Sequence, residues 1–143
     1  MKVQVINKSK HELPAYQTEH AAAFDVSADL DEPITLGSLE RYAVPTGLYL
    51  AIPQGYEFQI RSRSGLSVKH GIACINSPGT IDADYRGELK ILVANLSNEP
   101  YTINDGDRIA QVVLGKCERV EWEQVTELDE TARGAGGLGS TGK

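Results

Sequence analysis

The residues best suited to chemistry lie near the middle of the chain, between Asn76 and Glu88. This segment holds two aspartates, Asp82 and Asp84, followed at once by Tyr85. Because the aspartates are two residues apart, an extended or hairpin-like segment points only one of them into a given cavity. Such a carboxylate can orient and deprotonate a water molecule, and a tyrosine ring offers a flat wall for a sugar or base. The structural alternative is a turn whose aspartates bind their own backbone.

A pair of arginines precedes a predicted short helix. Arg61 and Arg63 are followed by Ser64, a good N-cap, and by Gly71, which can end the helix. Free backbone N–H groups and the helix dipole at such an N-terminus favour an anion. The sequence therefore predicts an anion site here, and a solvated arginine pair on an edge strand is the alternative.

Glycine makes up nearly half of the last eleven residues, 133–143. Backbone N–H groups of a glycine-rich segment can wrap an anion, and Arg133 adds a cation. The spacing is not that of a P-loop, and no strand leads into a long helix. The segment is predicted to be mobile unless a ligand or neighbour orders it; a permanently disordered tail is the alternative.

Two further stretches are weaker signals. The stretch from Ala21 to Ala28 is rich in small residues and includes Asp25, which could serve a metal. The stretch from Gly106 to Gln111 reads as a turn entering a buried strand. For this turn, a structural pair between its own aspartate and arginine is the simplest interpretation.

Short apolar stretches broken by turn residues must position these groups. Tyr56, Phe58 and Ile60 alternate with polar residues, as in a half-buried strand. The segment 89–94 is apolar on both faces, so it is expected to be buried on both. No longer helical stripe is present, and 143 residues suit one domain. The pattern predicts an all-β sandwich or barrel.

Composition limits the partners. The net charge of −6 argues against a nucleic-acid duplex, whose binding depends on many cationic contacts. No apolar run approaches the ~20 residues of a membrane helix, and the first ten residues do not resemble a secretory signal. Cys74 and Cys117 form neither a metal-binding pair nor a disulfide framework. We expect a cytoplasmic protein without membrane or nucleic-acid partners.

Taken together and in order, the five stretches resemble the five motifs of the trimeric dUTPase family. The resemblance spans nearly the whole chain and is most specific at Gly79-Thr80-Ile81-Asp82-Ala83-Asp84-Tyr85-Arg86-Gly87. It implies an all-β, distorted jelly-roll or barrel domain over residues 1–132, with a flexible arm at 133–143. It also implies a homotrimer in which the arm of one chain closes over a site built by the other two.

The activity implied is hydrolysis of dUTP to dUMP and pyrophosphate with Mg²⁺, by in-line attack of water on the α-phosphorus. This reaction limits uracil incorporation into DNA and supplies dUMP for thymidylate synthesis. Asp82 matches the catalytic base, with Asp84 a less favoured alternative, and Asp25 matches the residue that holds a metal-bound water. The substrate-binding residues implied are Arg63, Ser64, Gly65, Asn76, Gly79, Ile81, Tyr85, Gln111, Arg133, Leu138, Gly139, Ser140 and Thr141.

Within that set, the hairpin from Asn76 to Asp82 matches the uracil-reading element, and Tyr85 matches the residue that excludes a 2′-hydroxyl. Leu138 stands where the family usually has phenylalanine, so it can cover the base without stacking on it. Two rival functions are a dCTP deaminase, which shares the fold, and a non-catalytic nucleotide sensor. Lys69, His70 and Arg86 are assigned surface or structural roles by default.

Overall fold

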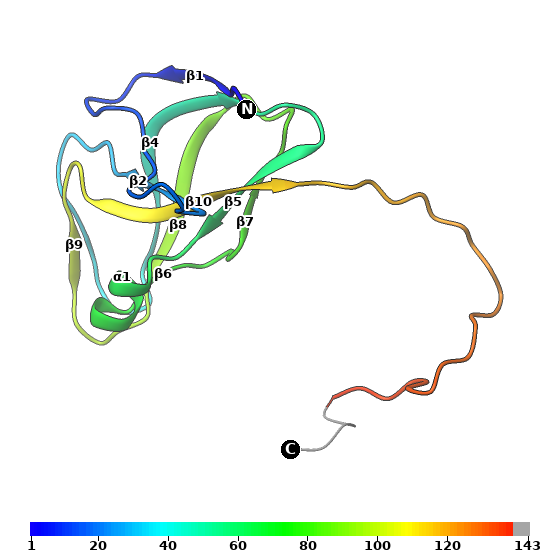
Figure 1. Ribbon diagram of the computed structural model, residues 1–143. Helices are drawn as coiled ribbons and strands as arrows, with labels where there is room; N and C mark the ends of the chain where they lie inside the picture. Colours follow the sequence, from blue (N-terminus) through cyan, green and yellow to red (C-terminus); the bar gives the residue numbers. More distant parts are fainter. Residues whose placement is uncertain (139–143) are drawn as a thin grey trace.

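The computed structural model describes residues 1–138 and shows an all-β body with one short helix (Figure 1). This confirms the predicted fold class. The strands and the helix are β1 Gln4–Asn7, β2 Phe24–Ser27, β3 Ile34–Leu36, β4 Arg41–Ala51, β5 Tyr56–Arg61, α1 Ser64–His70, β6 Ile72–Cys74, β7 Gly79–Ile81, β8 Glu88–Asn95, β9 Tyr101–Ile103 and β10 Arg108–Lys116.

Two four-stranded sheets enclose the core, with strand orders β1-β4-β8-β6 and β2-β10-β5-β7. A smaller pair, β3 and β9, closes one end. The alternation predicted for β5 is seen directly, since Phe58 and Ile60 are buried. They pack in one apolar cluster with residues from both sheets, including Val44, Ile91 and Val112.

The expectation that segment 89–94 is buried on both faces was wrong. In β8, Leu89, Ile91 and Val93 face the core, but Leu92 is 37% exposed and Lys90 is exposed. The reason is that antiparallel strands commonly bury only one face. On the other face Ala94 is only 3% exposed, so in the single chain that face is open at Lys90 and Leu92.

The helix α1 begins one residue away from the predicted place. The carbonyl of Arg63 accepts the bond from the Ser67 N–H at 3.0 Å, which makes Arg63 the N-cap. Ser64 is therefore the first helical residue, and the predicted serine cap was wrong. The predicted end is confirmed: Gly71 adopts φ 68° and its N–H bonds the Ser67 carbonyl at 3.1 Å.

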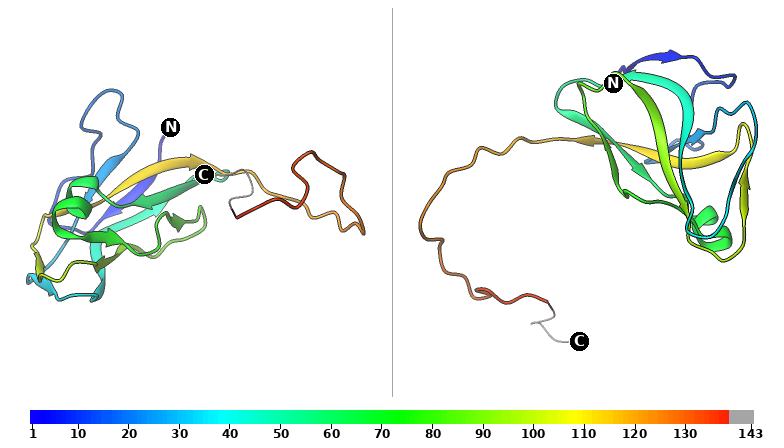
Figure 2. Two further views of the ribbon diagram at one scale, coloured as in Figure 1. Left: turned by 90° about the horizontal axis from the view of Figure 1, so that it is seen from below. Right: turned by 180° about the vertical axis from the view of Figure 1, so that it is seen from behind.

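The chain leaves the body after β10 ends at Lys116. Residues 117–138 contain no helix or strand. In every view of Figures 1 and 2 this stretch runs away from the two sheets. Trp122 in this stretch is 91% exposed. The boundary between body and arm at residue 132 stays a prediction. None of the helical structure in residues 1–138 is long and apolar enough to cross a membrane.

Candidate active site

A cavity of about 260 Å³ lies beside β7 and gathers the central motif. Its lining residues come from β5, from the hairpin before and after β7, and from the exposed face of β8. Five residues of the predicted set lie here: Asn76, Gly79, Ile81, Asp82 and Tyr85. This volume is near the lower end for ligand pockets, which suits one small molecule rather than a polymer.

Gly79 brings the hairpin backbone close to the cavity. A Cβ at this position would lie 3.0 Å from Nδ2 of Asn76 and 3.2 Å from Cβ of Ile60. A larger residue would have to push the hairpin outward. The glycine therefore lets the hairpin pack closely against β5 and against the Asn76 side chain.

The loop after β7 is held as a compact turn. The Tyr85 N–H bonds the Asp82 carbonyl at 3.2 Å. Nη1 of Arg86 donates to the carbonyls of Ala83, at 2.7 Å, and of Tyr85, at 2.9 Å. Arg86, to which the sequence assigned no function, thus holds the turn that presents Asp82 and Tyr85.

The two aspartates of this loop are placed differently. Asp82 lines the hairpin cavity and also a neighbouring cavity beside Cys117, whereas Asp84 lines only the latter. Desolvation, followed by the negative charges of Glu57 and Asp82, raises the pKa of the Cys117 thiol. The raised pKa disfavours the thiolate, which is the nucleophilic form of a cysteine.

A second cluster forms where β2, β10 and the start of α1 meet. Gln111 in β10 pairs with Asp25 in β2 on one side and with Arg61 in β5 on the other. Its Nε2 donates to the Ser62 carbonyl at 2.8 Å, which anchors the segment leading into α1. Oδ2 of Asp25 forms an ion pair with Nε of Arg63 at 3.2 Å. The structure thus brings Asp25, Arg63 and Gln111 together.

Ser64 and Gly65 open α1 beside this cluster. A Cβ at Gly65 would meet no atom within 4 Å, so the space next to it is open. Ser64 and Gly65 are both exposed, so the start of α1 is open to a ligand.

Arg108 is a member of this cluster that the sequence did not reveal. The expected pair within the turn was wrong, because the Asp107 carboxylate accepts from the Asn104 N–H at 2.7 Å. Arg108 instead places Nη1 3.2 Å from Oδ2 of Asp25, and its carbonyl accepts from Nη1 of Arg63 at 2.7 Å. A bulge between Arg108 and Ala110 shifts the strand alternation at this point. No local sequence signal marks such a bulge.

The net charge of the cluster favours binding of an anion. A metal ion would bind there only together with an anionic ligand such as a phosphate chain. Two guanidinium groups face one carboxylate, so Arg63, Arg108 and Asp25 leave a net positive charge. Oδ2 of Asp25 serves both arginines, and Oδ1 is left for a metal-bound water. Magnesium usually binds through one or two carboxylates together with substrate phosphates. Asp25 fits that role once a phosphate chain is present.

Another group of possible ligands lies elsewhere and has a structural explanation. His11 Nε2 lies 2.9 Å from Oδ1 of Asp105, and Asp29 is close by. Nζ of Lys10 already stands 3.7 Å from Asp105 and 3.9 Å from Asp29. The Leu30 N–H also donates to Asp105 at 2.8 Å. These contacts tie together three loops, and an ammonium group occupies the place that a cation would take.

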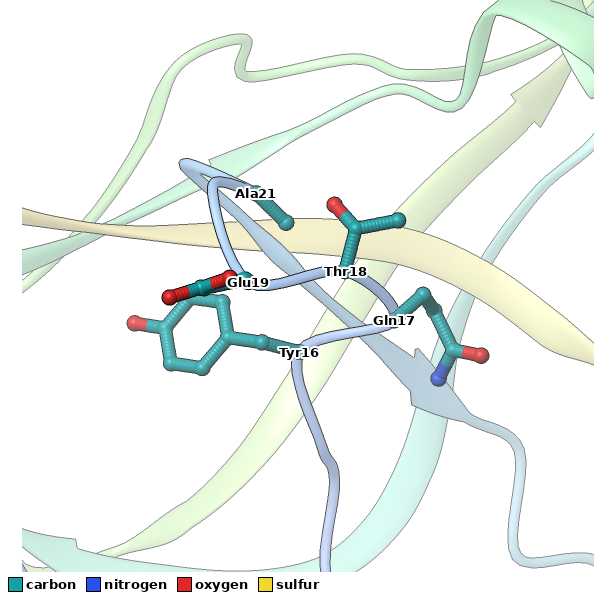
Figure 3. A pocket seen from close by; sticks show the side chains of 5 residues that line it. All are labelled: Tyr16, Gln17, Thr18, Glu19 and Ala21. Atoms are coloured by element: carbon teal, nitrogen blue, oxygen red, sulfur yellow. The ribbon is translucent and has the colours of Figure 1, made fainter.

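A shallow hollow of about 430 Å³ in the loop before β2 contains none of the predicted residues (Figure 3). Tyr16, Gln17, Thr18, Glu19 and Ala21 line it. Glu19 is the only one of them with an acidic side chain, and the Tyr16 ring packs edge-on against Phe24 at 5.5 Å. The hollow therefore offers no acid–base pair for chemistry.

The hairpin cavity and the arginine cluster are far apart within one chain. In the sheet β2-β10-β5-β7, Asp25 of β2 pairs with Gln111 of β10, which pairs with Arg61 of β5. Asp82 directly follows Ile81 of β7, which pairs with Phe58 of β5. Three strand spacings and about four residues along the strand separate the two aspartates, which is roughly 20 Å. The two carboxylates are therefore too far apart within one chain to contact the same small group.

The described part of the arm, residues 133–138, contributes to neither cluster within its own chain. Nε of Arg133 donates to the Gly136 carbonyl at 2.8 Å, and Leu138 is fully exposed. The chain after β10 runs away from the body in Figures 1 and 2. The predicted residues Gly139, Ser140 and Thr141 lie outside the described part of the chain.

The body and these two clusters define a jelly-roll protein built to hold a small anionic ligand. A family model described as dUTPase matches residues 9–142. The deoxyuridine 5′-triphosphate nucleotidohydrolase of Fusobacterium nucleatum is 58% identical over 143 residues, covering 100% of this chain and 98% of that protein. The same-named protein of Finegoldia magna is 58% identical over 142 residues, covering 99% of each. The chain belongs to the dUTPase family.

Solved structures agree. The G164S mutant of the Staphylococcus bacteriophage 80alpha dUTPase, with dUpNHpp, superposes with a TM-score of 0.89 at 29% identity, covering 99% of each chain. The D95N mutant of the S. aureus phage phi11 dUTPase, described with a structural Mg(II) ion, gives a TM-score of 0.81 at 27% identity. It covers 91% of this chain and 100% of that one.

Proposed function

We propose that the protein is a dUTP diphosphatase, which converts dUTP and water into dUMP and pyrophosphate. The observation that carries this proposal is the hairpin cavity, in which Asp82 and Tyr85 stand beside a glycine-lined backbone. The relatives at 58% identity carry the name deoxyuridine 5′-triphosphate nucleotidohydrolase. The activity would limit uracil incorporation into DNA and supply dUMP for thymidylate synthesis.

Recognition of the base is assigned to the hairpin. Backbone groups near Gly79 and Ile81, with the side-chain amide of Asn76, would pair with the edge of uracil. A site built on such polar contacts can reject a mismatched partner by ~10⁴-fold, because the wrong base leaves buried groups unpaired. Tyr85 lines the same cavity and would pack under the deoxyribose.

The hydrolytic water is assigned to Asp82. This carboxylate borders the cavity, so it can accept a proton from a water aimed at the α-phosphorus of a bound nucleotide. A carboxylate is a weak base at neutral pH, so its contribution rests mainly on holding the water in line. Asp84 lines only the neighbouring cavity, which supports the choice of Asp82.

The phosphate chain is assigned to the arginine cluster. Arg63 can bind phosphate oxygens through its planar fork, while Ser64, Gly65 and Gln111 border the same space. Asp25 orients the Arg63 guanidinium and keeps one oxygen free for a metal-bound water. Magnesium would neutralise charge on the phosphates and polarise the scissile bond.

The separation of the two clusters supports a homotrimer with shared sites. The base-reading cavity of one chain would meet the phosphate-binding cluster of a second. The third would supply the arm 133–143, with residues 1–132 forming the body. In the arm, Arg133 would contact the outer phosphates, and Leu138, Gly139, Ser140 and Thr141 would cover the nucleotide. We also place the enzyme in the cytoplasm, without nucleic-acid or membrane partners, which its acidic charge and unpaired cysteines support.

The test is pyrophosphate release from dUTP, UTP, dTTP and dCTP, each with and without magnesium, with ammonia measured for dCTP. We expect rapid release from dUTP alone and only with the metal. Asp82→Asn should lower turnover at saturating dUTP by ~10²-fold or more, with Asp84→Asn as the matched control. Ammonia from dCTP would identify a deaminase instead, and binding of dUTP without turnover would identify a sensor.

A further inference from the structure

The ring of Tyr85 occupies the space that a side chain at residue 87 would need. A Cβ built on Gly87 would stand 2.5 Å from Cζ of Tyr85 and 2.9 Å from its Cε2, and it would also collide with the hydroxyl. The hydroxyl donates to the Glu88 carbonyl at 3.1 Å. The ring therefore lies across the Gly87 backbone and is tied down just beyond it.

Backbone conformation does not explain the glycine at this position. Gly71 and Gly106 have φ of 68° and 82°, a region that other residues rarely adopt. Gly87 is outside that region. What distinguishes it is the tyrosine ring, which leaves no room for a side chain.

We propose that Gly87 is a specificity-positioning residue, which sets the discrimination between deoxyribose and ribose by letting the Tyr85 ring lie flat. The inference rests on the proposed function, in which Tyr85 packs under the sugar. With any side chain at 87, the ring has to rotate away and its bond to the Glu88 carbonyl breaks. The sugar side of the cavity then opens to a 2′-hydroxyl.

The geometry separates this role from a role in folding. The atoms that must move are the end of a tyrosine side chain that is 45% exposed, and none of them belongs to the backbone. The neighbours of a displaced ring are therefore solvent on one side. Gly87→Ala should leave the folded protein intact while changing which sugar it accepts.

The experiment measures kcat/KM for dUTP and for UTP in the wild type and in Gly87→Ala. We expect the dUTP-to-UTP ratio to fall by about tenfold or more, mainly through faster UTP hydrolysis. Turnover of saturating dUTP should stay within a few-fold. The matched control is Gly37→Ala, where a Cβ would make only ordinary contacts at 3.5 Å with the Glu40 side chain; its ratio should equal that of the wild type.

A double-variant cycle tests whether Gly87 acts through Tyr85. Tyr85→Ala should itself lower the ratio, and adding Gly87→Ala to it should change nothing more, because the ring is already gone. Tyr85→Phe keeps the ring but loses the bond to Glu88. Its dUTP-to-UTP ratio should lie between those of the wild type and Gly87→Ala.

Two results would overturn the inference. One is an unchanged dUTP-to-UTP ratio in a folded Gly87→Ala enzyme that still hydrolyses dUTP. The other applies if Gly87→Ala does not fold. The steric argument then requires the double variant Tyr85→Ala/Gly87→Ala to fold as well as Tyr85→Ala does. A double variant that does not fold would refute the steric argument. A wild-type protein that does not hydrolyse dUTP would instead refute the proposed function.

Discussion

Removing the charge of Asp25 should weaken both the fold and the catalytic reaction. Its Oδ2 forms ion pairs with Arg63 and Arg108, each at 3.2 Å. The side chain of Asp25 is 18% exposed, that of Arg63 27% and that of Arg108 51%. In Asp25→Asn, two guanidinium groups would share one neutral acceptor. The substitution keeps the shape of the side chain, so any effect comes from the charge and from the lost acceptor.

The magnitude follows from the burial. Breaking a fully buried pair costs about 3–5 kcal/mol, whereas exposed pairs contribute about 0–1 kcal/mol. The contribution of the Asp25–Arg63 pair should lie between these two limits. The contribution of the Asp25–Arg108 pair should lie near the lower limit, because Arg108 is half exposed. We expect Asp25→Asn to lower the free energy of unfolding by about 1–3 kcal/mol. Because Arg63 loses its orientation, kcat/KM for dUTP should fall by about tenfold or more.

Urea unfolding and pyrophosphate release measure the two effects. Asp31→Asn is the control, since Asp31 pairs with Lys10 at 3.4 Å but is fully exposed. It should leave both the free energy of unfolding and the kinetics nearly unaltered, because exposed ion pairs contribute little. If Asp25→Asn behaved like Asp31→Asn in both assays, the cluster would not orient Arg63 and the assignment of the phosphate site would be wrong.

The remaining predictions concern acid stability and the arm. Bonds from the Leu30 N–H and then from His11 lower the pKa of Asp105, so its stabilisation is complete above the unfolded pKa of ~3.9 and is lost as pH falls through the lower folded value. Asp105→Asn should therefore flatten the loss of thermal stability below about pH 4, and unchanged pH profiles would contradict this. A chain ending at residue 132 should keep its fold and oligomeric state in size-exclusion chromatography yet lose most dUTP hydrolysis; full activity would remove the role of the arm. Arg133→Ala alone should lower turnover at saturating dUTP. Leu138→Phe should tighten binding of a non-hydrolysable dUTP analogue by about 0.5–1.5 kcal/mol if the residue covers the base, which calorimetry can measure.

Several features followed from local sequence alone. The alternation in β5 predicted a half-buried strand, and Gly71 predicted the end of α1, because each depends on residues that are neighbours along the chain. The order of the motifs was enough to indicate the dUTPase family, and the family comparison agrees. The helix start was misplaced by one residue, since a cap is defined by which carbonyl accepts the first bond.

Tertiary structure alone decided which charged groups form pairs and how far apart the two site aspartates lie. Arg108 was expected to pair within its own turn, but a bulge and the neighbouring strand bring it to Asp25. Leu92 was expected to be buried but is exposed. Its burial depends on which other element covers that face of β8, and the sequence of the strand does not encode this. The distance between Asp25 and Asp82 likewise depends on strand order, a property of long-range pairing. Residues that neighbour one another in a motif keep that relation in any fold, whereas contacts between motifs exist only once the sheets have formed.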